Sequence, residues 1–236
     1  MSPGPSPDLR RAVAVANNDI AAAGLVVHAF GNVSGVDRDA GVFAIKPSGI
    51  PCEEVTEDDL VLISIQDGST VWGNNRPSSD TPTHRAIYRG WQTVGGVVHT
   101  HSLFATAWAQ ARKAIPCLGT THADHFRGPV PVTRPLTANE IEGEYEANTG
   151  EVIVEMYTNG GLDPAEIPGA LVASHGPFAW GTDPSAAVDT AAAMELLARL
   201  ALHTLAISPL QPPLEKPLLE RHFLRKHGPS AYYGQP

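Results

Sequence analysis

Residues 95–110, GGVVHTHSLFATAWAQ, place two histidines at the junction between an apolar run and a helix-like run. The run GGVV is short, β-branched and preceded by a polar segment, which is typical of a buried strand, and Ser102 can cap a helix after it. Side chains alternate between the two faces of a strand, so His99 and His101 point the same way. The spacing predicts either a pair of hydrogen-bonded structural histidines or two imidazoles that share one metal ion.

Two further residues could complete such a metal site. His175 lies in SHGPFAWG, at a turn between two predicted strands, and Asp80 lies in SSDTPTH, just before a predicted helix. Taken singly, a histidine at a turn is usually structural and an aspartate before a helix is usually a cap. Three imidazoles and one carboxylate together suit Zn²⁺, with Mn²⁺ and Co²⁺ as alternatives.

Three short turn-like segments share a chemistry that suits an anion. They are GNVSG (31–35), KPSG (46–49) and PSSD (77–80), and Lys46 adds a positive charge. Small residues with hydroxyl or amide groups at a turn can leave backbone N–H groups facing an anion. None of the three matches the phosphate loop or the dinucleotide-binding pattern. Each could be only a turn, and together they indicate an anion site near the metal ligands.

Composition narrows the class of protein. The chain has 236 residues, 42% of them hydrophobic, which suits one domain over residues 1–236 with residues 1–6 as a loose tail. Its net charge of −9 argues against nucleic-acid and anionic-membrane partners. Two cysteines provide no disulfide framework, and neither a signal peptide nor an apolar run long enough to cross a bilayer is evident. We expect a cytoplasmic protein.

The pattern along the chain predicts a mixed α/β fold. Asp67-Gly68 between two apolar runs is a hairpin signal, so the sheet is not all parallel. Thr137 followed by Glu140 predicts a capping box. The long helix from Pro184 to about Ile207 could be a core helix or a subunit contact, and the basic, aromatic tail could be docked or frayed. We predict strands over 25–30, 42–49, 60–65, 69–73, 95–100 and within 170–180, a tight turn over 31–35, and helices over 7–23, 81–91, 103–111, 138–146 and 184–207.

Long segments of the chain resemble the class II aldolase/epimerase family. They are GNVSGVDRDAGVFAIKPSGI, PSSDTPTH, GGVVHTHS, IPCLGTTHADHF, EIEGEYEANTGEVIVE, SHGPFAWG and RKHGPSAYYGQ, and they run nearly end to end. The resemblance implies a three-layer architecture with a central, largely antiparallel sheet flanked by helices. It also implies a homotetramer with active sites between subunits, in which residues 218–236 form an arm that reaches a neighbour.

The same resemblance assigns roles to individual residues. It implies divalent-metal ligands at Asp80, His99, His101 and His175. It implies an acid/base pair at Asp124 and Tyr233, with His222 supplied beside Tyr233 by a neighbouring subunit, and an outer position at Glu146. It implies that the substrate is held by Gly31, Asn32, Lys46, Ser48, Gly49, Ser78, Ser79 and His222. His125, and the pair Ala29-Phe30, depart from residues common in the family without touching a metal position.

The resemblance further implies the reaction. The chain is most similar to the epimerase branch of the family, which interconverts L-ribulose 5-phosphate and D-xylulose 5-phosphate by breaking and remaking the C3–C4 bond. The same chemistry serves both arabinose and ascorbate breakdown. A class II sugar-phosphate aldolase is the alternative, although Asp80 stands where the aldolases carry a glutamate base. A non-catalytic binding domain of the same fold is the remaining alternative.

Overall fold

The computed structural model describes residues 7–27 and 30–233, and the predicted loose tail over residues 1–6 lies outside that range. A seven-stranded sheet runs through the molecule in the order β4-β3-β2-β1-β5-β7-β6, and every neighbouring pair is antiparallel. The predicted mixed α/β fold with a largely antiparallel sheet is confirmed. The strands are β1 (Asn32–Asp37), β2 (Val42–Ile45), β3 (Val61–Ser64), β4 (Thr70–Trp72), β5 (Gly96–His99), β6 (Gly169–Leu171) and β7 (Pro177–Gly181).

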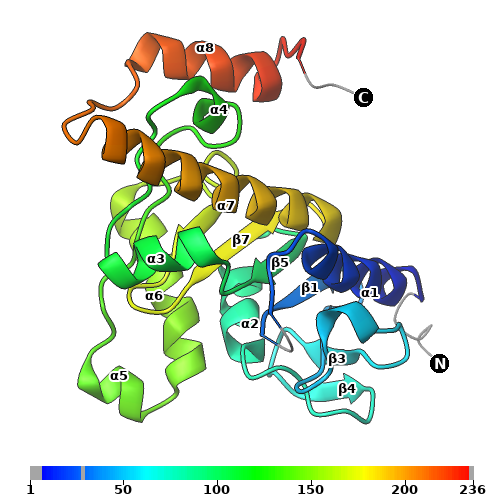
Figure 1. Ribbon diagram of the computed structural model, residues 1–236. Coiled ribbons are helices and arrows are strands. Elements are labelled where there is room, and N and C mark those ends of the chain that lie inside the picture. Colours follow the sequence, from blue (N-terminus) through cyan, green and yellow to red (C-terminus); the bar gives the residue numbers. More distant parts are fainter. Residues whose placement is uncertain (1–6, 28–29, 234–236) are drawn as a thin grey trace.

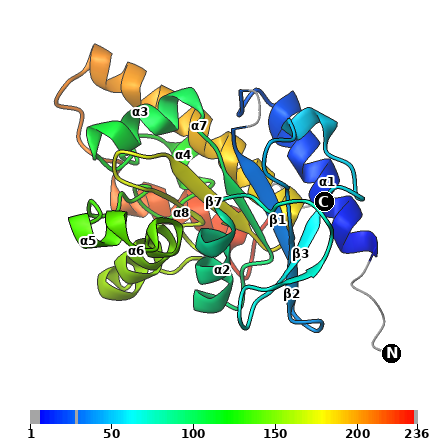
Figure 2. The same cartoon turned by 90° about the horizontal axis from the view of Figure 1, so that it is seen from below.

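Helices cover both faces of this sheet (Figures 1 and 2). On one face lie α1 (Pro7–Ala22), α3 (Leu103–Ala111) and α7 (Pro184–Ile207), which pack against β1, β5, β6 and β7. On the other face α2 (Thr81–Gly90) and α6 (Tyr145–Gly160) pack against each other. The main core fills the space between the layers with residues such as Phe43, Val97 and Trp180. The result is the predicted three-layer arrangement.

Residues 31–35 are not the tight turn that their small, polar residues predicted. Asn32 begins β1, which lies in the middle of the sheet between β2 and β5. The small residues serve close packing instead, because a Cβ on Gly35 would lie 2.6 Å from the Pro184 side chain and 2.8 Å from Val13. Only Gly31, with φ of +94°, has the backbone conformation of a turn.

The strand predicted over residues 25–30 is also wrong wherever the structure describes it. Residues 25–27 and Phe30 have no regular secondary structure, and residues 28–29 lie outside the described residues. Leu25 is still buried in the core, and Gly24, with φ of +68°, ends the turn after α1. Val27 and Phe30 are exposed, at 64% and 63%, so the apolar run is neither a strand nor a buried segment beyond Leu25.

The helices beside the histidines begin close to where the sequence predicted. Asp80 precedes α2, which begins at Thr81 and has Pro82 in its first turn. Ser102 precedes α3 but makes no side-chain cap; Glu195 of α7 accepts hydrogen bonds from the Phe104 and Ala105 backbone N–H groups, at 2.8 and 2.9 Å. A carboxylate from the neighbouring helix thus takes the place of the local cap.

The segment after residue 137 is helical but interrupted. The capping box of Thr137 and Glu140 opens α5 (Ala138–Glu142) as predicted. The helix stops at Gly143 and α6 restarts at Tyr145, so the stretch EVIVEMY, ambiguous in sequence, is helix. The restart matters for the site because Tyr145 and Glu146, the first residues of α6, line the same cavity as His99 at the end of β5.

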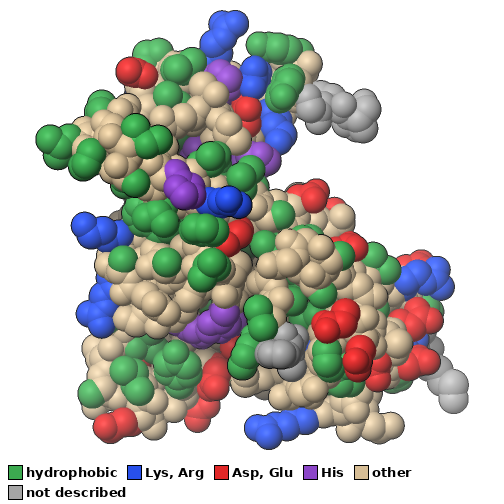
Figure 3. Space-filling model, in the orientation of Figure 1, with side chains coloured by type: hydrophobic (Ala, Val, Ile, Leu, Met, Phe, Trp, Pro, Cys, Tyr) green, Lys and Arg blue, Asp and Glu red, His purple; other side chains and the backbone are tan. Residues whose placement is uncertain are grey.

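Helix α7 is long and largely apolar, with the charged residues Asp189, Glu195 and Arg199 along it. By length and composition it could cross a bilayer, with a mean hydropathy of 1.3 over its apolar window, although a core helix of a soluble protein passes the same test. Its buried side packs on β5 and β7. Leu196, Leu200 and Ile207 on its other side are exposed, and Figure 3 shows hydrophobic side chains gathered at the upper left, where α7 ends.

The C-terminal segment is docked rather than frayed. Helix α8 (Lys216–His227) packs on the short α4 (Thr120–Ala123), at the top of Figure 1. Arg127 joins this layer to the body, because it forms ion pairs with Glu220 of α8 at 2.6 Å and with Glu166. Phe223 is the one α8 residue in the described chain that is fully buried.

Candidate metal centre

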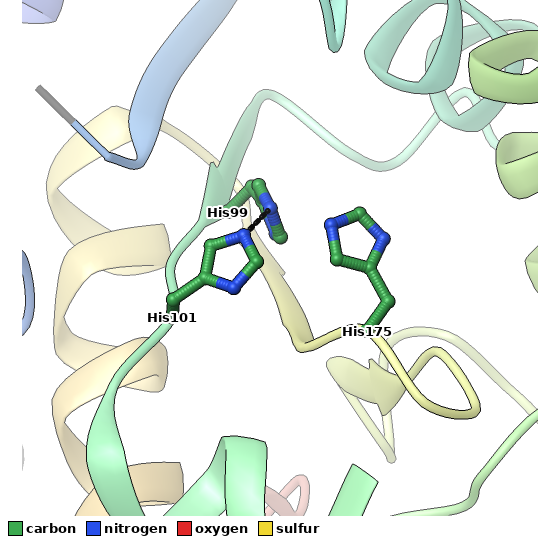
Figure 4. A group of neighbouring side chains, drawn as sticks. All are labelled: His99, His101 and His175. Atoms are coloured by element: carbon green, nitrogen blue, oxygen red, sulfur yellow. Dashed lines mark hydrogen bonds between the residues drawn. The ribbon is translucent and has the colours of Figure 1, made fainter. Parts of the chain in front are cut away.

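Three imidazoles meet beside the end of β5 (Figure 4). His99 is the last residue of β5, His101 follows two residues later, and His175 comes from the β6–β7 turn. One ring nitrogen from each lies within 4.8 Å of the other two, and the Nε2 atoms of His99 and His101 are 3.1 Å apart. Two nitrogens bound to one tetrahedral zinc ion lie about 3.3 Å apart, so this spacing fits a shared cation.

A backbone hydrogen bond leaves one nitrogen of His99 with a lone pair that could bind a metal. Its Nδ1 donates a hydrogen bond to the Pro177 carbonyl, at 2.9 Å, so that nitrogen carries the proton. The lone pair is then at Nε2, which faces His101. Metal-binding histidines are usually oriented in this way, by a backbone carbonyl on the other nitrogen. The ring is held further by stacking on Phe178, with centroids 4.1 Å apart at 14°.

The other two rings are also suited to binding a cation. Burial, and then the charges of His99 and His101, lower the pKa of His175 to about 4. Burial, followed by the His99 charge, lowers the pKa of His101. The Nδ1 atom of His175 is buried and has no hydrogen-bond partner among the described residues. Neutral imidazoles with an unpaired nitrogen are ready to bind a metal at neutral pH.

Asp80 lines the same cavity but lies outside that group of three nitrogens. Its Oδ2 accepts a hydrogen bond of 2.7 Å from the Asn32 amide, which also donates to Ser78 Oγ at 3.1 Å. Burial by itself raises the pKa of Asp80. The His99 and His84 rings and the Asn32 hydrogen bond together lower it by more, so the net pKa is below its usual value. Asp80 is therefore an ionised carboxylate held at the edge of the imidazole group.

One cavity of about 380 Å³ joins the imidazoles to the predicted anion site. This cavity is lined by all four predicted metal ligands. It is also lined by the seven predicted substrate-binding residues that lie in the N-terminal half of the chain. Its lining consists of Phe30, Gly31, Asn32, Lys46, Pro47, Ser48, Gly49, Ser78, Ser79, Asp80, His99, His101, Tyr145, Glu146 and His175. Two turns and two histidine-containing segments, far apart in the sequence, thus line one cavity.

The backbone of the two turns is less open to an anion than the sequence suggested. The Ser48 N–H donates to Arg76 O at 2.9 Å, and the Ser78 N–H donates to Lys46 O at 3.1 Å. These bonds hold the turns against each other and use amides that an anion would need. The charge of the Lys46 side chain, 2% exposed, and the serine hydroxyls remain as the groups that could hold an anion.

Three predicted site residues lie elsewhere. Asp124, His222 and Tyr233 do not line the cavity; they gather where α4 meets α8. His222 Nδ1 donates to Asp124 Oδ1 at 3.1 Å, and the Arg225 guanidinium binds Asp124 Oδ2 at 2.8 Å. Burial raises the pKa of Asp124, but Arg225 and His222 lower it more, so this carboxylate is ionised. Within one chain, the predicted acid/base pair is separate from the imidazoles.

Sequence reasoning missed several residues that the structure places at these two locations. Arg225 lies with its guanidinium carbon 4.2 Å from the Tyr233 ring centre and so bridges Asp124 and Tyr233. Tyr145 lines the cavity with its ring 6.3 Å from that of His175. His84, which the sequence did not single out, is fully buried one helical turn after Asp80, with Nε2 unpartnered among the described residues. The tail's basic run was the only signal for Arg225.

Known proteins resemble this chain along most of its length. The family described as Class II Aldolase and Adducin N-terminal domain matches residues 11–202. Proteins named L-ribulose-5-phosphate 4-epimerase UlaF, from Salmonella paratyphi B (strain ATCC BAA-1250 / SPB7) and Salmonella typhi, are 52% identical over 227 residues, which cover 96% of this chain and 98% of theirs.

Solved structures share the fold at lower identity. An L-fuculose 1-phosphate aldolase matches with a TM-score of 0.77 and 23% identity, covering 92% of this chain and 95% of that one. YgbL from Klebsiella pneumoniae, described as a putative aldolase/epimerase/decarboxylase, matches with a TM-score of 0.72 and 23% identity over 92% and 99% of the two chains. The fold, the imidazole group and the matched residues agree: this protein belongs to the family of class II aldolases and adducin N-terminal domains.

Proposed function

We propose that this protein is a metal-dependent epimerase that interconverts L-ribulose 5-phosphate and D-xylulose 5-phosphate. The observation that carries the proposal is that one cavity holds both the three imidazoles and the Lys46–serine surface, in a chain 52% identical to the UlaF epimerases. A sugar phosphate needs both features, because its hydroxyl and carbonyl oxygens bind a cation while its phosphate needs a positive, hydrogen-bonding pocket.

The chemistry of the substrate explains why a cation site suits this reaction. The two sugars differ only at C4, whose hydrogen is not adjacent to the C2 carbonyl, so its removal gives no stabilised carbanion. Removing the proton of the C4 hydroxyl instead allows the C3–C4 bond to break. The fragments are the enediolate of dihydroxyacetone and glycolaldehyde phosphate, and rotation of the aldehyde before re-addition inverts C4.

His99, His101 and His175, with Asp80, would hold the cation, most simply Zn²⁺, with Mn²⁺ and Co²⁺ as alternatives. A cation bound there would act as a Lewis acid for the negative charge that develops at O2 and O3. Asp80 suits the position of a ligand better than that of a mobile base, because Asn32 already fixes one of its oxygens. This arrangement favours the epimerase over the aldolase.

The rest of the cavity would keep the aldehyde fragment in place. We assign phosphate binding to the side chains of Lys46, Ser48, Ser78 and Ser79, with Asn32 and the turns at Gly31 and Gly49 shaping the pocket around the substrate. Lys46 supplies the charge, although burial, opposed by Cys52, Asp80 and Glu53, lowers its pKa. Retention of the phosphate distinguishes an epimerase from an aldolase, which must release its fragments. Glu146 also lines the cavity, and we assign it an outer role.

Asp124 and Tyr233 would move protons on the two faces of the rotating aldehyde. They lie away from the imidazoles of their own chain, beside His222 on the docked arm. We therefore propose a homotetramer in which residues 218–236 complete the site of a neighbour, with the chain acting as one cytoplasmic domain over residues 1–236. The exposed apolar side of α7 supports such a subunit contact.

A product assay tests the function directly. Metal-loaded protein with L-ribulose 5-phosphate should yield D-xylulose 5-phosphate, and free glycolaldehyde phosphate should not accumulate. Accumulation of free aldehyde would favour the aldolase, and the absence of any turnover with bound metal would favour a non-catalytic domain. The assay separates the three alternatives in one experiment because each gives a different product pattern.

A further inference from the structure

A chain of three buried polar side chains lies behind the metal centre. Ser34 Oγ of β1 is 2.7 Å from His84 Nδ1 and 2.7 Å from the Tyr88 hydroxyl. All three residues are 0% exposed. His84 and Tyr88 are four residues apart on α2, so they share one face of that helix. Polar groups are rarely buried so deeply unless they are fully paired.

One end of this chain is not paired. His84 Nε2 is buried and has no hydrogen-bond partner among the described residues. The Tyr88 hydroxyl can donate to Ser34, and Ser34 can donate to His84 Nδ1, which leaves the imidazole proton on Nε2. The unpaired atom is then a donor, and a donor buried without an acceptor is costly.

Two of the proposed metal ligands lie near His84. Asp80 precedes His84 by one helical turn, and the His84 backbone N–H donates to Asp80 O at 3.0 Å. The His84 ring meets Phe178 edge-on at 6.1 Å, and Phe178 also stacks on His99. His84 therefore lies one helical turn from Asp80 and shares Phe178 as a neighbour with His99.

We propose that Tyr88, Ser34 and His84 are positioning residues: His84 Nε2–H, which has no partner among the described residues, would take the Asp80 carboxylate as its acceptor and fix it for metal binding. Asn32 holds one oxygen of that carboxylate and His84 would hold Asp80 from the helix side. Outer residues that orient a metal ligand commonly change affinity by about 10–100-fold when they are removed. The inference rests on the proposed metal centre and does not depend on the sugar that reacts.

Two substitutions at one position test the role of the Nε2 donor. His84→Asn places an amide near the Nδ1 position and removes the donor, whereas His84→Gln returns an amide near the Nε2 position. We expect His84→Asn to weaken Co²⁺ and Zn²⁺ binding about 10–100-fold and to alter the visible spectrum of bound Co²⁺. His84→Gln should recover most of that affinity. Both are measured by competition with a chromogenic chelator, without any turnover.

His122→Asn is the matched control. His122 is another buried histidine, 3% exposed, with its Nε2 donating to Gly128 O at 2.7 Å, and it lies on α4 away from the cavity. Its substitution should lower thermal stability and leave cobalt affinity and spectrum unchanged. If His84→Asn does not fold, Ser34→Ala interrupts the same chain from β1, and it should weaken cobalt binding in the same direction.

The outcomes separate this inference from the proposed function. Wild-type cobalt affinity and spectrum in both His84→Asn and Ser34→Ala would overturn the positioning chain while leaving the metal centre intact. Equal loss in His84→Asn and His84→Gln would overturn the assigned donor. Failure of the wild-type protein itself to bind any divalent cation would instead remove the metal centre on which both proposals rest.

Discussion

His99 links the register of the sheet to the chemistry of the cavity. Across the strands it is the partner of Asn32 in β1 and of Phe178 in β7, so the three side chains form a row on the face covered by α2. Pro177 fixes the protonated nitrogen, and Phe178 fixes the plane of the ring. A one-residue slip of β5 would turn His99 to the opposite face and dismantle the centre.

Substitution at His99 and at Tyr233 should separate metal binding from proton transfer. We expect His99→Asn to lose both bound metal and activity, because one of three imidazoles is removed. Tyr233→Phe should keep wild-type metal content and lose about 10²–10⁴-fold in turnover, the usual size of a general acid/base contribution. Metal analysis and steady-state rates on the same samples measure both. Normal turnover in Tyr233→Phe would show that its hydroxyl transfers no proton.

The buried His122 should make the metal-free fold sensitive to mild acid. Burial, opposed by the Gly128 carbonyl, lowers its pKa from 6.5 to about 4. As the pH falls, the unfolded chain takes up this proton first, so the stabilising contribution is complete above pH 6.5 and is lost by about pH 4. The loss attributable to this group is about 3 kcal/mol.

Urea unfolding in the presence of a chelator, at pH 7 and near pH 4.5, measures this loss. His122→Gln keeps a donor for Gly128 but cannot titrate, so its free energy of unfolding should fall less over that interval. A wild-type protein and a variant with the same dependence on pH would contradict the assigned neutral state of His122.

At the scale of elements, the positions of helix ends and strands depend on contacts with other elements as much as on local sequence. Asp183-Pro184 and the Thr137 capping box predicted their helices because each signal lies within one turn. The strand β1 was missed because Gly, Asn and Ser favour turns locally, and only packing against α1 and α7 explains the small residues. The cap of α3 was unpredictable, since Glu195 lies 90 residues from Ala105.

Removal of the Glu195 cap should destabilise the fold. We expect Glu195→Ala to lower the free energy of unfolding by about 1–2 kcal/mol, because two backbone N–H groups in the first turn of α3 lose a charged acceptor. Glu151→Ala, on the exposed surface of α6, is the control and should change stability by less than about 0.5 kcal/mol. Equal stability of the two variants would show that water replaces the Glu195 carboxylate without cost.

At the scale of the whole molecule, the structure divides the proposed chemistry between two places. The imidazoles and the residues proposed to bind phosphate share one cavity, whereas Asp124, His222 and Tyr233 share the α4–α8 layer. The sequence could suggest both sets through spacing and resemblance. It could not show that Arg225 binds Asp124, or that His84 is buried against Ser34 with one nitrogen unpaired among the described residues, because both depend on contacts between distant segments.

Mixed oligomers test whether the arm serves a neighbour. Subunits carrying His99→Asn lack metal, and subunits carrying Tyr233→Phe lack the tail hydroxyl, so each pure variant should be almost inactive. In oligomers assembled from equal amounts of the two, about a quarter of the sites would combine an intact centre with an intact neighbouring tail. Recovery of activity on co-expression measures this. No recovery, in oligomers shown to contain both subunits, would mean that each tail acts on its own chain.

The central claim is that His99, His101 and His175 hold one divalent cation that epimerisation requires, and titration of turnover against bound metal tests it most directly. Protein stripped by a chelator should lose the conversion of L-ribulose 5-phosphate. Activity should then return in proportion to added Zn²⁺, Mn²⁺ or Co²⁺ and saturate at about one ion per chain. A stripped, metal-free protein that converts the sugar at the undiminished rate would contradict the account.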